Sequence, residues 1–580
     1  MFHLSSLRAL ILLIGCGIFG LTYAGRIFYT GSDPQPALLV SQAILEHHTV
    51  RLDAYEHAPD SPLNHYTVVQ RNGHDYYNYP IGTPIFSLPF VWAANLAGKD
   101  MSVLQDNYRV QKLIAGLLCA LTFFLLYSIG RHFLSAAHSA VIAGVSVLGS
   151  SLTSTMGTAL WNTDFAVFFI LLSLLLIVRH DRGQASAATP YSLGLFLFAA
   201  YLCRPAASVF ILVTLAYSFA RDRNFFLKVA ATSSILLVGY LIFSRVEYGQ
   251  WIEEYYSASR LGPRHGRLAL YGLFLSPSRG LLVYSPFFAP VLAGLLWYFD
   301  ALKRNALVWF CLIWSGLHLL IVARNSGWWG GHSFGPRLLT EAVPALVLIT
   351  VILWQALSQK ASRHARRVFQ VSYLALGAAG IWINSVQGLY NYSTARWNST
   401  PDIDRNSAYL FDWKYPQFLA TAESVHARML EHILRQAERG SLNLAPYALG
   451  DTLAYTDRNS RIFVGWSDPE PGRRWSEITS PKILFEPGPM VRLDEEEEIA
   501  LEIVSGSWGT QPVTLYLNGA RIGEVTLQGP PAAYSLTFDG ALLKPGDLNQ
   551  IEFIIPGAAF PGNGDLRRLG MSFVGLRITP

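Results

Sequence analysis

A single carboxylate, Asp33, stands in the string "YTGSDPQPALL" that begins at Tyr29. The string follows an apolar run over about residues 7–28, so it would lie where the chain leaves a membrane. One interpretation of Asp33 is a helix N-cap, because its oxygens could accept from free amides and Pro34 suits the first helical position. The other is a general base, since a carboxylate at the membrane boundary could take a proton from a hydroxyl of a lipid-borne substrate. The residues alone leave both interpretations open.

A second group that could do chemistry is a set of arginines in segments that the topology below places on the outer face. Arginine near the bilayer edge is costly unless it is paired or useful, and it can bind a phosphate through two donors. Arg204, Arg279 and Arg337 are the candidates for phosphate binding. The alternative is contact with lipid headgroups or pairing with Glu247, Glu253, Glu254 and Glu341. The other arginines of the set are Arg260, Arg264, Arg267 and Arg324.

The string "GWWGGHSFGPRLL" at residues 327–339 combines two tryptophans, a glycine pair and a charged tail. A membrane interface would explain Trp328 and Trp329 as aromatic anchors, but it would not explain the glycines, which permit positive φ or close backbone approach. We take the two tryptophans as supporting or acceptor-side candidates. His332 is a donor-side candidate, with a structural hydrogen bond as the alternative. Asp164, in "LWNTDFAVFF", opens another apolar run and is either a cap or a second supporting acid.

Composition indicates the kind of protein that positions these residues. Of the 580 residues, 51% are hydrophobic and 14% are charged, and the mean hydropathy is +0.29. Soluble domains carry about 25% charged residues, so the composition predicts a polytopic membrane protein. The four cysteines lie in or beside apolar runs without metal-ligand spacing, which argues against disulfides and a zinc–thiolate site.

Apolar runs long enough to span a membrane, or nearly so, recur through the first 390 residues. Residues 190–219 are interrupted at Arg204-Pro205, which predicts two short helices. Residues 80–98 contain three prolines, and we expect them to form a juxtamembrane or re-entrant helix that does not cross. The other runs lie at about 7–28, 110–129, 138–156, 164–178, 226–244, 281–299, 306–323, 338–357 and 368–389.

This arrangement gives about eleven spans and a consistent distribution of basic residues. The intervening cytoplasmic loops then hold clusters such as Arg221, Arg223 and Lys228, and Arg363, Arg366 and Arg367. The positive-inside rule therefore predicts a cytoplasmic N-terminus, and the odd number of spans predicts an external C-terminal region.

The composition changes after residue 390. Residues 391–455 predict a connector with one amphipathic helix, "TAESVHARMLEHILRQAERG". Residues 456–580 predict a β-sandwich, because short alternating strands recur and Asn518-Gly519 is typical of a hairpin turn. Its Trp466, Trp475 and Trp508 predict either an exposed glycan-binding surface or the core of a structural lid.

Several strings resemble the C-type glycosyltransferase superfamily, polytopic enzymes that use polyprenyl-phosphate sugars. The similarity covers about residues 1–415 and includes "YNYPIGTPIF", the "CRP" interruption, "SPSRGLLVYSPF" and "WWGGHSFGPRLL". It implies that Asp33 matches the essential aspartate of the first outer loop and that Asp164 is similar in position to a second acid. It places Tyr79 among the supporting residues. The C-terminal strands look like the carbohydrate-binding sandwich that some members append.

The resemblance implies a function and a location. We expect an inverting glycosyltransferase of the bacterial inner membrane that moves a monosaccharide from a polyprenyl-phosphate donor to a glycan, lipid or protein acceptor on the periplasmic face. Many members carry two adjacent acids in the first motif, whereas Ser32 and Pro34 flank a single Asp33 here. We therefore predict no metal cofactor, and no nucleic-acid partner.

Two alternatives remain at this point. A transporter or flippase of lipid-linked sugars would favour ionisable residues within spans and repeated halves, whereas the unusual strings here lie at one face. An O-antigen polymerase or ligase would also use large outer loops, but the early aspartate favours transfer of single sugars.

Overall fold

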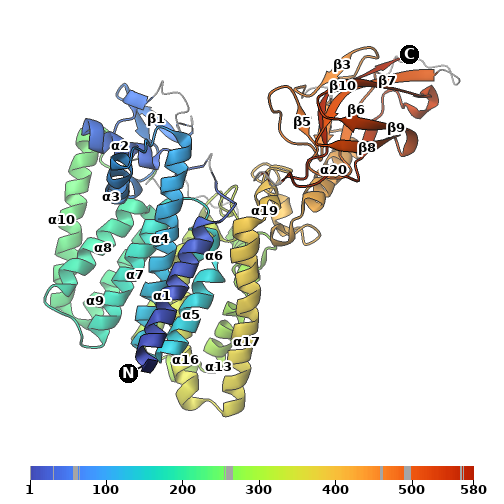
Figure 1. Cartoon of the computed structure of the whole chain (residues 1–580). Helices are drawn as coiled ribbons and strands as arrows, with labels where there is room; N and C mark the ends of the chain where they lie inside the picture. The colour runs from blue at the N-terminus through green and yellow to red at the C-terminus, as the bar shows by residue number, and fades with distance from the viewer. Residues whose placement is uncertain are drawn as a thin grey trace. The chain divides into compact units, whose positions relative to one another are not determined.

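The structure is a computed structural model, and its helices and strands fall into two compact units. It describes residues 2–29, 32–55, 63, 66–253, 255, 266–457, 461–488, 498–561, 565 and 567–580. Glu254, Arg260 and Arg264, named above, lie outside these ranges. The first unit comprises residues 1–395 and 403–419, and the second comprises residues 396–402 and 420–580 (Figure 1).

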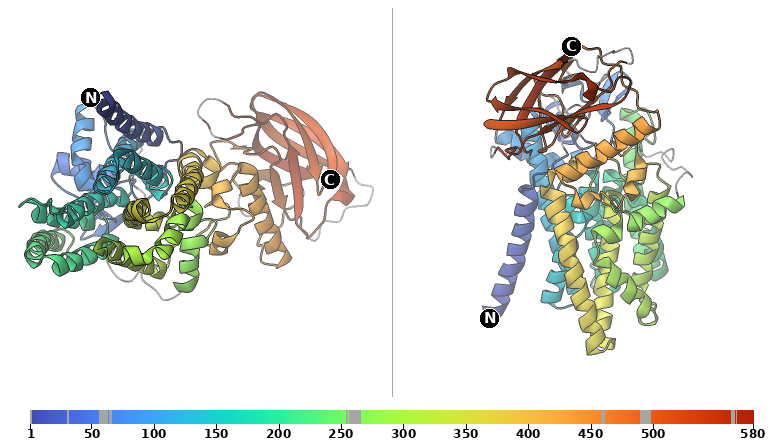
Figure 2. Two further views of the ribbon diagram at one scale, coloured as in Figure 1. Left: turned by 90° about the horizontal axis from the view of Figure 1, so that it is seen from below. Right: turned by 90° about the vertical axis from the view of Figure 1, so that its right-hand side faces the viewer.

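The first unit is helical. Within the described residues, six segments are long and apolar enough to cross a membrane, and six shorter apolar helices accompany them. The predicted total of about eleven spans therefore remains a prediction. The six long segments are Leu104–Arg131, Asn162–Asp181, Arg223–Glu247, Ala306–Arg324, Arg337–Lys360 and Arg363–Tyr390. Viewed along their axes, the helices lie side by side (Figure 2).

The helices of the first unit follow most of the predicted apolar runs, but two runs are interrupted. Residues 138–156 contain helices that end at Leu148 and Ser154, and residues 281–299 contain helices that end at Tyr284 and Trp297. The helices of the unit are α1 (Phe2–Tyr23), α2 (Ala37–His47), α3 (Gly82–Leu96), α4 (Leu104–Arg131), α5 (Ala136–Leu148), α6 (Ser151–Ser154), α7 (Asn162–Asp181), α8 (Thr189–Cys203), α9 (Ser208–Arg221), α10 (Arg223–Glu247), α11 (Gly266–Leu275), α12 (Leu281–Tyr284), α13 (Phe288–Trp297), α14 (Phe299–Leu302), α15 (Ala306–Arg324), α16 (Val343–Lys360), α17 (Arg363–Ile381) and α18 (Gly388–Tyr390). The short helix α19 (Tyr392–Arg396) ends at the boundary of the unit.

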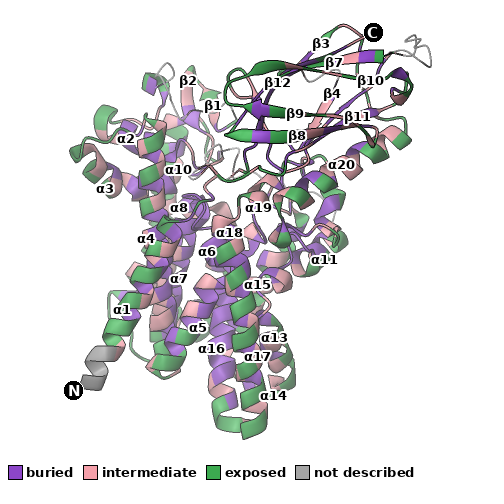
Figure 3. Ribbon diagram, turned by 45° about the vertical axis from the view of Figure 1, so that its right-hand side comes forward, coloured by how far each residue is buried: buried purple, intermediate pink, exposed green. Residues whose placement is uncertain are grey.

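Burial separates helices inside the bundle from helices at its surface. In Figure 3, α16 is mostly buried, whereas α17 shows more exposed surface. The most apolar windows of these two segments are 83% and 39% buried, respectively, and the window of α10 is only 17% buried. A helix that is apolar all round and largely uncovered is the pattern expected where lipid is the solvent.

The predicted interruption at Arg204-Pro205 is confirmed. Helix α8 ends at Cys203, Arg204 has extended backbone angles (φ −154°, ψ 119°), and a short 3-10 turn leads into α9. Proline causes this break, because it disfavours the helical conformation in the residue before it. The break leaves the Arg204 side chain at the end of a helix instead of along its flank.

Helix α3 packs against this break through a glycine. A Cβ atom added to Gly82, the first residue of α3, would lie 2.5 Å from the backbone nitrogen of Cys203 and 2.6 Å from the carbonyl of Leu202. Only glycine permits this approach, because backbone atoms cannot rotate away as a flexible side chain can. The predicted juxtamembrane segment is therefore a helix whose start is fixed against the residue before Arg204.

Between α2 and α3 the chain forms a small antiparallel hairpin of β1 (Val68–Arg71) and β2 (His74–Tyr77). Two ion pairs connect this part of the chain with the end of α10 and the segment that follows it. Arg51 Nε lies 2.8 Å from Oε1 of Glu247, the last residue of α10, and Arg71 Nη1 lies 3.8 Å from the buried Glu253. The hairpin leads directly into Tyr79, so these contacts help to fix that side chain.

The second unit contains the predicted sandwich. One antiparallel sheet has the order β10-β7-β12-β3, with β5 also paired to β12, and the other has the order β4-β6-β11-β8-β9. The strands are β3 (Thr452–Ala454), β4 (Arg461–Val464), β5 (Arg474–Trp475), β6 (Lys482–Phe485), β7 (Glu498–Ser507), β8 (Thr510–Leu517), β9 (Ala520–Gln528), β10 (Ala532–Asp539), β11 (Asn549–Ile554) and β12 (Met571–Thr579). Inward residues of both sheets form one hydrophobic core.

Local signals in this unit are confirmed in detail. Asn518 and Gly519 have φ of 51° and 88° and join β8 to β9, as a primed hairpin turn requires. The predicted amphipathic helix is α20 (Ala422–Glu438), whose first turn is closed by a capping box between Thr421 and Ser424.

The three tryptophans of the sandwich have different environments. Trp466 is 3% exposed and belongs to the core, which contradicts its assignment to an exposed glycan surface. Its indole nitrogen donates to the carbonyl of Lys482, so the ring packs inside while its polar edge is satisfied. Trp475 is half-buried, and Trp508 is 44% exposed.

Candidate active site

Asp33 lies in a turn and does not cap α2. Helix α2 begins at Ala37, its N-cap residue is Pro36, and no side chain accepts from its free amides. The N-cap interpretation is therefore wrong, because three residues separate Asp33 from Ala37, the first helical residue. The carboxylate is available for other contacts.

Two tyrosines at the end of the β1–β2 hairpin hold Asp33. The Tyr79 hydroxyl donates to Asp33 Oδ1 over 2.9 Å, and the Tyr77 hydroxyl donates to the Asp33 backbone oxygen over 2.9 Å. A hydrogen bond to a carboxylate is stronger than one between neutral groups, so Tyr79 fixes the orientation of the carboxylate plane. Tyr79 thus has the supporting position that the resemblance implies.

Asp33 forms part of the wall of a cavity of about 510 Å³, which we call the Asp33 cavity. The segments that line it are far apart in the sequence and all belong to the first unit. Its polar and aromatic lining residues include Asp33, Tyr79, Trp161, Asn162, Arg204, Tyr255, Asn325 and Arg337. A volume of this size, with a few converging polar groups, suits a small-molecule group such as a sugar phosphate.

Arg337 faces Asp33 across this cavity. Its Nη1 lies 3.9 Å from Asp33 Oδ2, and its guanidinium stacks 4.3 Å above the ring of Trp161. Its Nε atom is buried without a hydrogen-bond partner, and no described residue accepts a hydrogen bond from its side chain. A guanidinium has five N–H donors. Arg337 is therefore a cation that is positioned by the Trp161 ring and whose hydrogen-bond donors are unused.

Arg204 also lines the cavity, but it has protein partners. Its Nη1 donates to the Thr163 hydroxyl over 2.6 Å, and its Nε is ion-paired with Glu341. The Arg204 side chain is 16% exposed, whereas Glu341 is 1% exposed. Arg204 therefore lines the cavity, as a phosphate ligand would, and it also pairs with Glu341, which was the alternative interpretation.

Arg279 does not line the cavity. It is fully buried, and its donors bond to the carbonyls of Trp329 (2.7 Å), Ser278 (2.7 Å) and Gly331 (3.0 Å) and to the side chain of Gln417 (2.6 Å). Burial lowers the pKa of Arg279 to about 10. We correct its assignment from phosphate binding to organisation of the loop that precedes Arg337.

The other candidates in "GWWGGHSFGPRLL" likewise do not line the cavity. Trp328 is 3% exposed and packs so closely on α11 that a Cβ at Gly272 would lie 2.2 Å from its ring. The Trp329 indole donates to Asp404 over 2.7 Å, and His332 Nε2 lies 3.8 Å from the same carboxylate. These residues shape the loop, and we assign them no ligand contact.

Asp164 lies at the third position of α7 and is fully buried. Neither of its oxygens has a hydrogen-bond partner among the described groups, and it is not part of the cavity lining. A cation shared between Asp33 and a second acid would need both carboxylates at one place. The described lining residues offer Asp33 only with the Arg337 guanidinium beside it, so they do not fit such a metal site.

Tyrosine hydroxyls around Asp33 remain protonated over the physiological range. Burial, and next the charge of Asp33, raise the pKa of Tyr66 to about 12. Burial raises the pKa of Tyr79 further, with the charge of Asp33 and the hydrogen bond to it as additional causes. A tyrosine beside an ionised carboxylate acts as a donor and not as a second base.

Sequence reasoning missed three residues around the cavity. Trp161, which stacks under Arg337, was visible in "LWNTD" but had no assigned role. Tyr255, whose ring centroid lies 5.2 Å from that of Tyr79, gave no signal because tyrosines are common near membrane interfaces. Glu341 was expected only as one of several possible arginine partners.

Comparison of the sequence with protein-family models finds no match, and a search of curated proteins also finds none. Among solved structures, the chain is similar to ArnT from Cupriavidus metallidurans in the apo state, with a TM-score of 0.45 and 13% identity over 77% of this chain and 83% of that chain. The same enzyme bound to undecaprenyl phosphate gives a TM-score of 0.43 and 12% identity over 76% and 82%.

The chain is also similar to the Archaeoglobus fulgidus oligosaccharyltransferase tethered with an acceptor peptide. The TM-score is 0.44 and the identity is 14%, over 71% of this chain and 59% of the longer one.

Proposed function

We propose that the chain is an inverting glycosyltransferase that moves a monosaccharide from a polyprenyl-phosphate donor to an envelope acceptor, at the periplasmic face of a bacterial inner membrane. One observation carries the proposal. A carboxylate whose Oδ1 is occupied by Tyr79 directs its Oδ2 toward a guanidinium with unused donors, on the wall of one cavity. That pair offers a base for a hydroxyl and a cation for a phosphate.

The reaction follows from these two groups. Asp33 Oδ2 takes the proton of an acceptor hydroxyl while the hydroxyl oxygen attacks the anomeric carbon. The bond from the anomeric carbon to the phosphate oxygen breaks, and its electron pair remains on the phosphate. Attack from the side opposite to the leaving phosphate inverts the anomer, and a single carboxylate suffices because the phosphate leaves without a proton.

Arg337 would stabilise the charge that develops on the leaving phosphate. Its donors need no existing partner to be displaced, and stacking on Trp161 restricts the guanidinium before the substrate arrives. A preorganised cation is worth most where charge appears in the transition state. Arg204 would provide further N–H donors to the phosphate from the same wall of the cavity.

A transporter or flippase would move the lipid-linked sugar without breaking that bond. The experiment is therefore to incubate the purified full-length chain in nanodiscs with an α- or β-linked polyprenyl-phosphate monosaccharide and a hydroxyl acceptor, and to assign the product anomer by NMR. The proposal predicts release of polyprenyl phosphate with inverted configuration. Retention of configuration, or movement of donor across a vesicle membrane without its consumption, would contradict it.

A further inference from the structure

Glu341 lies in the 3-10 helix Arg337–Ala342 that precedes α16, behind the wall of the Asp33 cavity. It is 1% exposed and contacts three polar side chains. It is ion-paired with Arg204, the Thr163 hydroxyl lies 3.4 Å from its Oε1, and His318 Nε2 lies 3.4 Å from its Oε2. Glu341 does not line the cavity, so it can act on a ligand through its contacts with Arg204 and through its charge, but not by direct contact.

His318 holds this carboxylate from the far side. Its Nε2 also lies 2.9 Å from the carbonyl oxygen of Leu338. The Leu338 carbonyl is an acceptor, so Nε2 carries the hydrogen and donates to it, while Glu341 Oε2 lies 3.4 Å from the same nitrogen. A carboxylate fixed by a histidine, a hydroxyl and an arginine has little freedom to turn.

The contacts on Arg204 determine which of its donors can reach a ligand. Glu341 occupies the Nε edge, and Thr163 accepts from Nη1 over 2.6 Å. No described residue takes up the Nη2 hydrogens, and Arg204 is a lining residue of the cavity. Glu341 and Thr163 therefore fix the guanidinium of Arg204 at Nε and Nη1, and its Nη2 donors are available to a ligand in the cavity.

Glu341 also changes the charge of the site. The cavity wall carries two guanidinium groups, those of Arg204 and Arg337, and one carboxylate, Asp33. The buried Glu341 compensates Arg204, which leaves Arg337 opposite Asp33 as the cation that a phosphate meets. In the low-dielectric interior of a protein, one unit of charge close to the cavity changes the binding free energy of an anion strongly.

The proposed reaction changes the charge of the lipid. The donor is a phosphodiester with one negative charge, and the product is a phosphomonoester that approaches two negative charges at neutral pH, because its second pKa is about 6. Without Glu341 the site would carry one more positive charge, and this charge would favour the dianionic product over the donor. We infer, on the basis of the proposed function, that Glu341 is a positioning residue that both orients Arg204 and lowers the field of the phosphate site, so that the dianionic product is released.

The test compares the product with the donor in the full-length chain. Steady-state kinetics in nanodiscs give KM and kcat for a polyprenyl-phosphate monosaccharide, and equilibrium binding gives the Kd of undecaprenyl phosphate. Glu341→Gln removes the charge and keeps the size. We expect the Kd of undecaprenyl phosphate to fall about tenfold while the donor KM changes less than about threefold, so that kcat becomes limited by product release.

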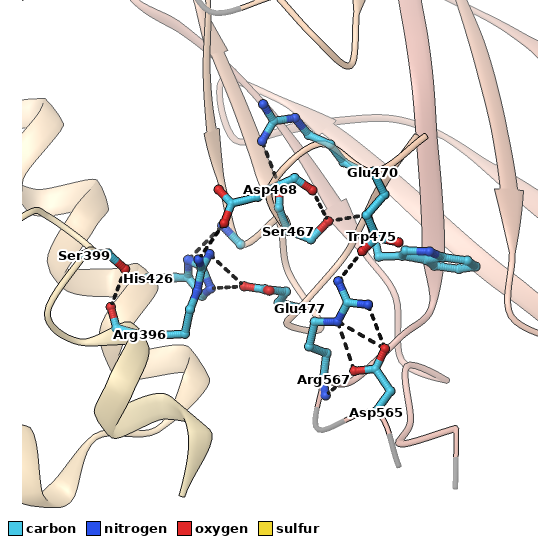
Figure 4. A network of polar contacts seen from close by, with 12 residues as sticks. Arg396, Ser399, His426, Ser467, Asp468, Glu470, Trp475, Glu477, Asp565 and Arg567 are labelled. Atoms are coloured by element: carbon cyan, nitrogen blue, oxygen red, sulfur yellow. Dashed lines mark hydrogen bonds and ion pairs between the residues drawn. The ribbon is translucent and has the colours of Figure 1, made fainter. Parts of the chain in front are cut away.

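The second unit supplies a matched control. There Glu477 is buried beside His426 Nε2 at 3.3 Å and Arg396 Nη2 at 3.3 Å, which repeats the same three side-chain types (Figure 4). Glu477→Gln removes the charge of another buried glutamate, which does not line the cavity. We expect it to leave both the donor KM and the Kd of undecaprenyl phosphate unchanged.

If Glu341→Gln does not fold, a variant in which both partners are neutral serves instead, because an unpaired buried charge destabilises a protein more than a neutral pair does. The double variant Arg204→Gln/Glu341→Gln restores the net charge of the wall. We expect its donor KM to rise while the ratio of product Kd to donor KM stays within about twofold of the wild type.

The outcomes separate the two proposals. A wild type that turns over donor, with a Glu341→Gln variant whose product-to-donor ratio is unchanged, overturns the inference and leaves the function intact. The same holds for a neutral double variant whose ratio shifts tenfold. A wild type that binds undecaprenyl phosphate but consumes no donor overturns the proposed function instead.

Discussion

The Tyr79 hydroxyl donates to Asp33 Oδ1 over 2.9 Å and so distinguishes the two oxygens of one carboxylate. Oδ1 is engaged, whereas Oδ2 faces the cavity and lies 3.9 Å from Arg337 Nη1. Tyr79 follows a hairpin whose Arg71 is ion-paired with Glu253, in the segment after α10. The orientation of the Asp33 carboxylate therefore depends on contacts some distance from the cavity.

Removal of the Tyr79 hydroxyl should affect catalysis more than donor binding. Tyr79→Phe keeps the ring against Tyr255 and loses the hydrogen bond that orients the base. A hydrogen bond to a charged group contributes about 1.5–3 kcal/mol, so we expect kcat to fall roughly tenfold or more with little change in donor KM. Steady-state kinetics measure both quantities.

Tyr55→Phe is the control for that substitution. Its hydroxyl also donates to a carboxylate, Glu46 at 3.0 Å, but neither residue lines the cavity. Wild-type kcat in Tyr79→Phe, or an equal loss in Tyr55→Phe, would show that the hydroxyl does not orient the base.

Arg337→Lys should weaken donor binding although the charge is kept. Lysine loses the planar donor set and the close stack on Trp161. We expect the donor KM to rise at least about tenfold, which corresponds to about 1.4 kcal/mol. Arg324→Lys, at the exposed end of α15, is the control; a donor KM unchanged in Arg337→Lys would remove Arg337 from the phosphate site.

The tyrosines near Asp33 predict a specific alkaline destabilisation. Burial raises the pKa of Tyr29 to about 12 from the ordinary 10.0, and the pKa of Tyr66 is raised to about 12. The folded state therefore retains protons that the unfolded state loses, so this stabilisation is complete below pH 10 and is lost as pH rises toward 12. Arg279, whose pKa is lowered, acts in the opposite direction.

The measurement compares the wild type with Tyr29→Phe/Tyr66→Phe, because Arg279 is common to both. We expect the Tm of the wild type to fall more steeply between pH 10 and 12, and tyrosinate absorbance of the folded wild type to include a late component that the variant lacks. Parallel Tm curves would contradict the assignment.

Gly82→Ala should disturb the site through the start of α3. The added Cβ would meet the backbone of Leu202 and Cys203 within 2.6 Å, directly before Arg204. We expect a lower Tm and a raised donor KM, because the α8–α9 break must shift. Gly144→Ala in α5 is the control, since nothing lies within 4 Å of its Cβ position; equal Tm values for the two variants would refute the packing argument.

Local features of the fold could be predicted because local chemistry determines them. The proline after Arg204 ends α8, Asn518-Gly519 makes the β8–β9 turn, and the capping residues open α20. The cavity could not be predicted in this way, because Asp33, Arg204 and Arg337 come together only through packing of distant helices.

The arginines show the same limit. Arg279 and Arg337 both precede apolar helices beside prolines, and sequence alone treats them alike. Packing buries Arg279 among carbonyls, whereas Arg337 stacks on Trp161 with its donors unused. The neighbours of each guanidinium, not its position in the chain, decide which one is available to an anion.

The most direct test of the account is donor turnover by Asp33→Asn, measured beside donor binding in the same nanodisc preparation. Asparagine keeps the bond from Tyr79 but cannot take a proton, and a positioned base contributes about 10²–10⁴-fold. We predict that kcat falls by at least about 10²-fold while the donor Kd stays within about threefold of the wild type. The control is Asp53→Asn, which changes an aspartate between α2 and α3 that is bonded to His74, and we expect this variant to be fully active. Wild-type turnover in Asp33→Asn would contradict the assignment of Asp33 as the base.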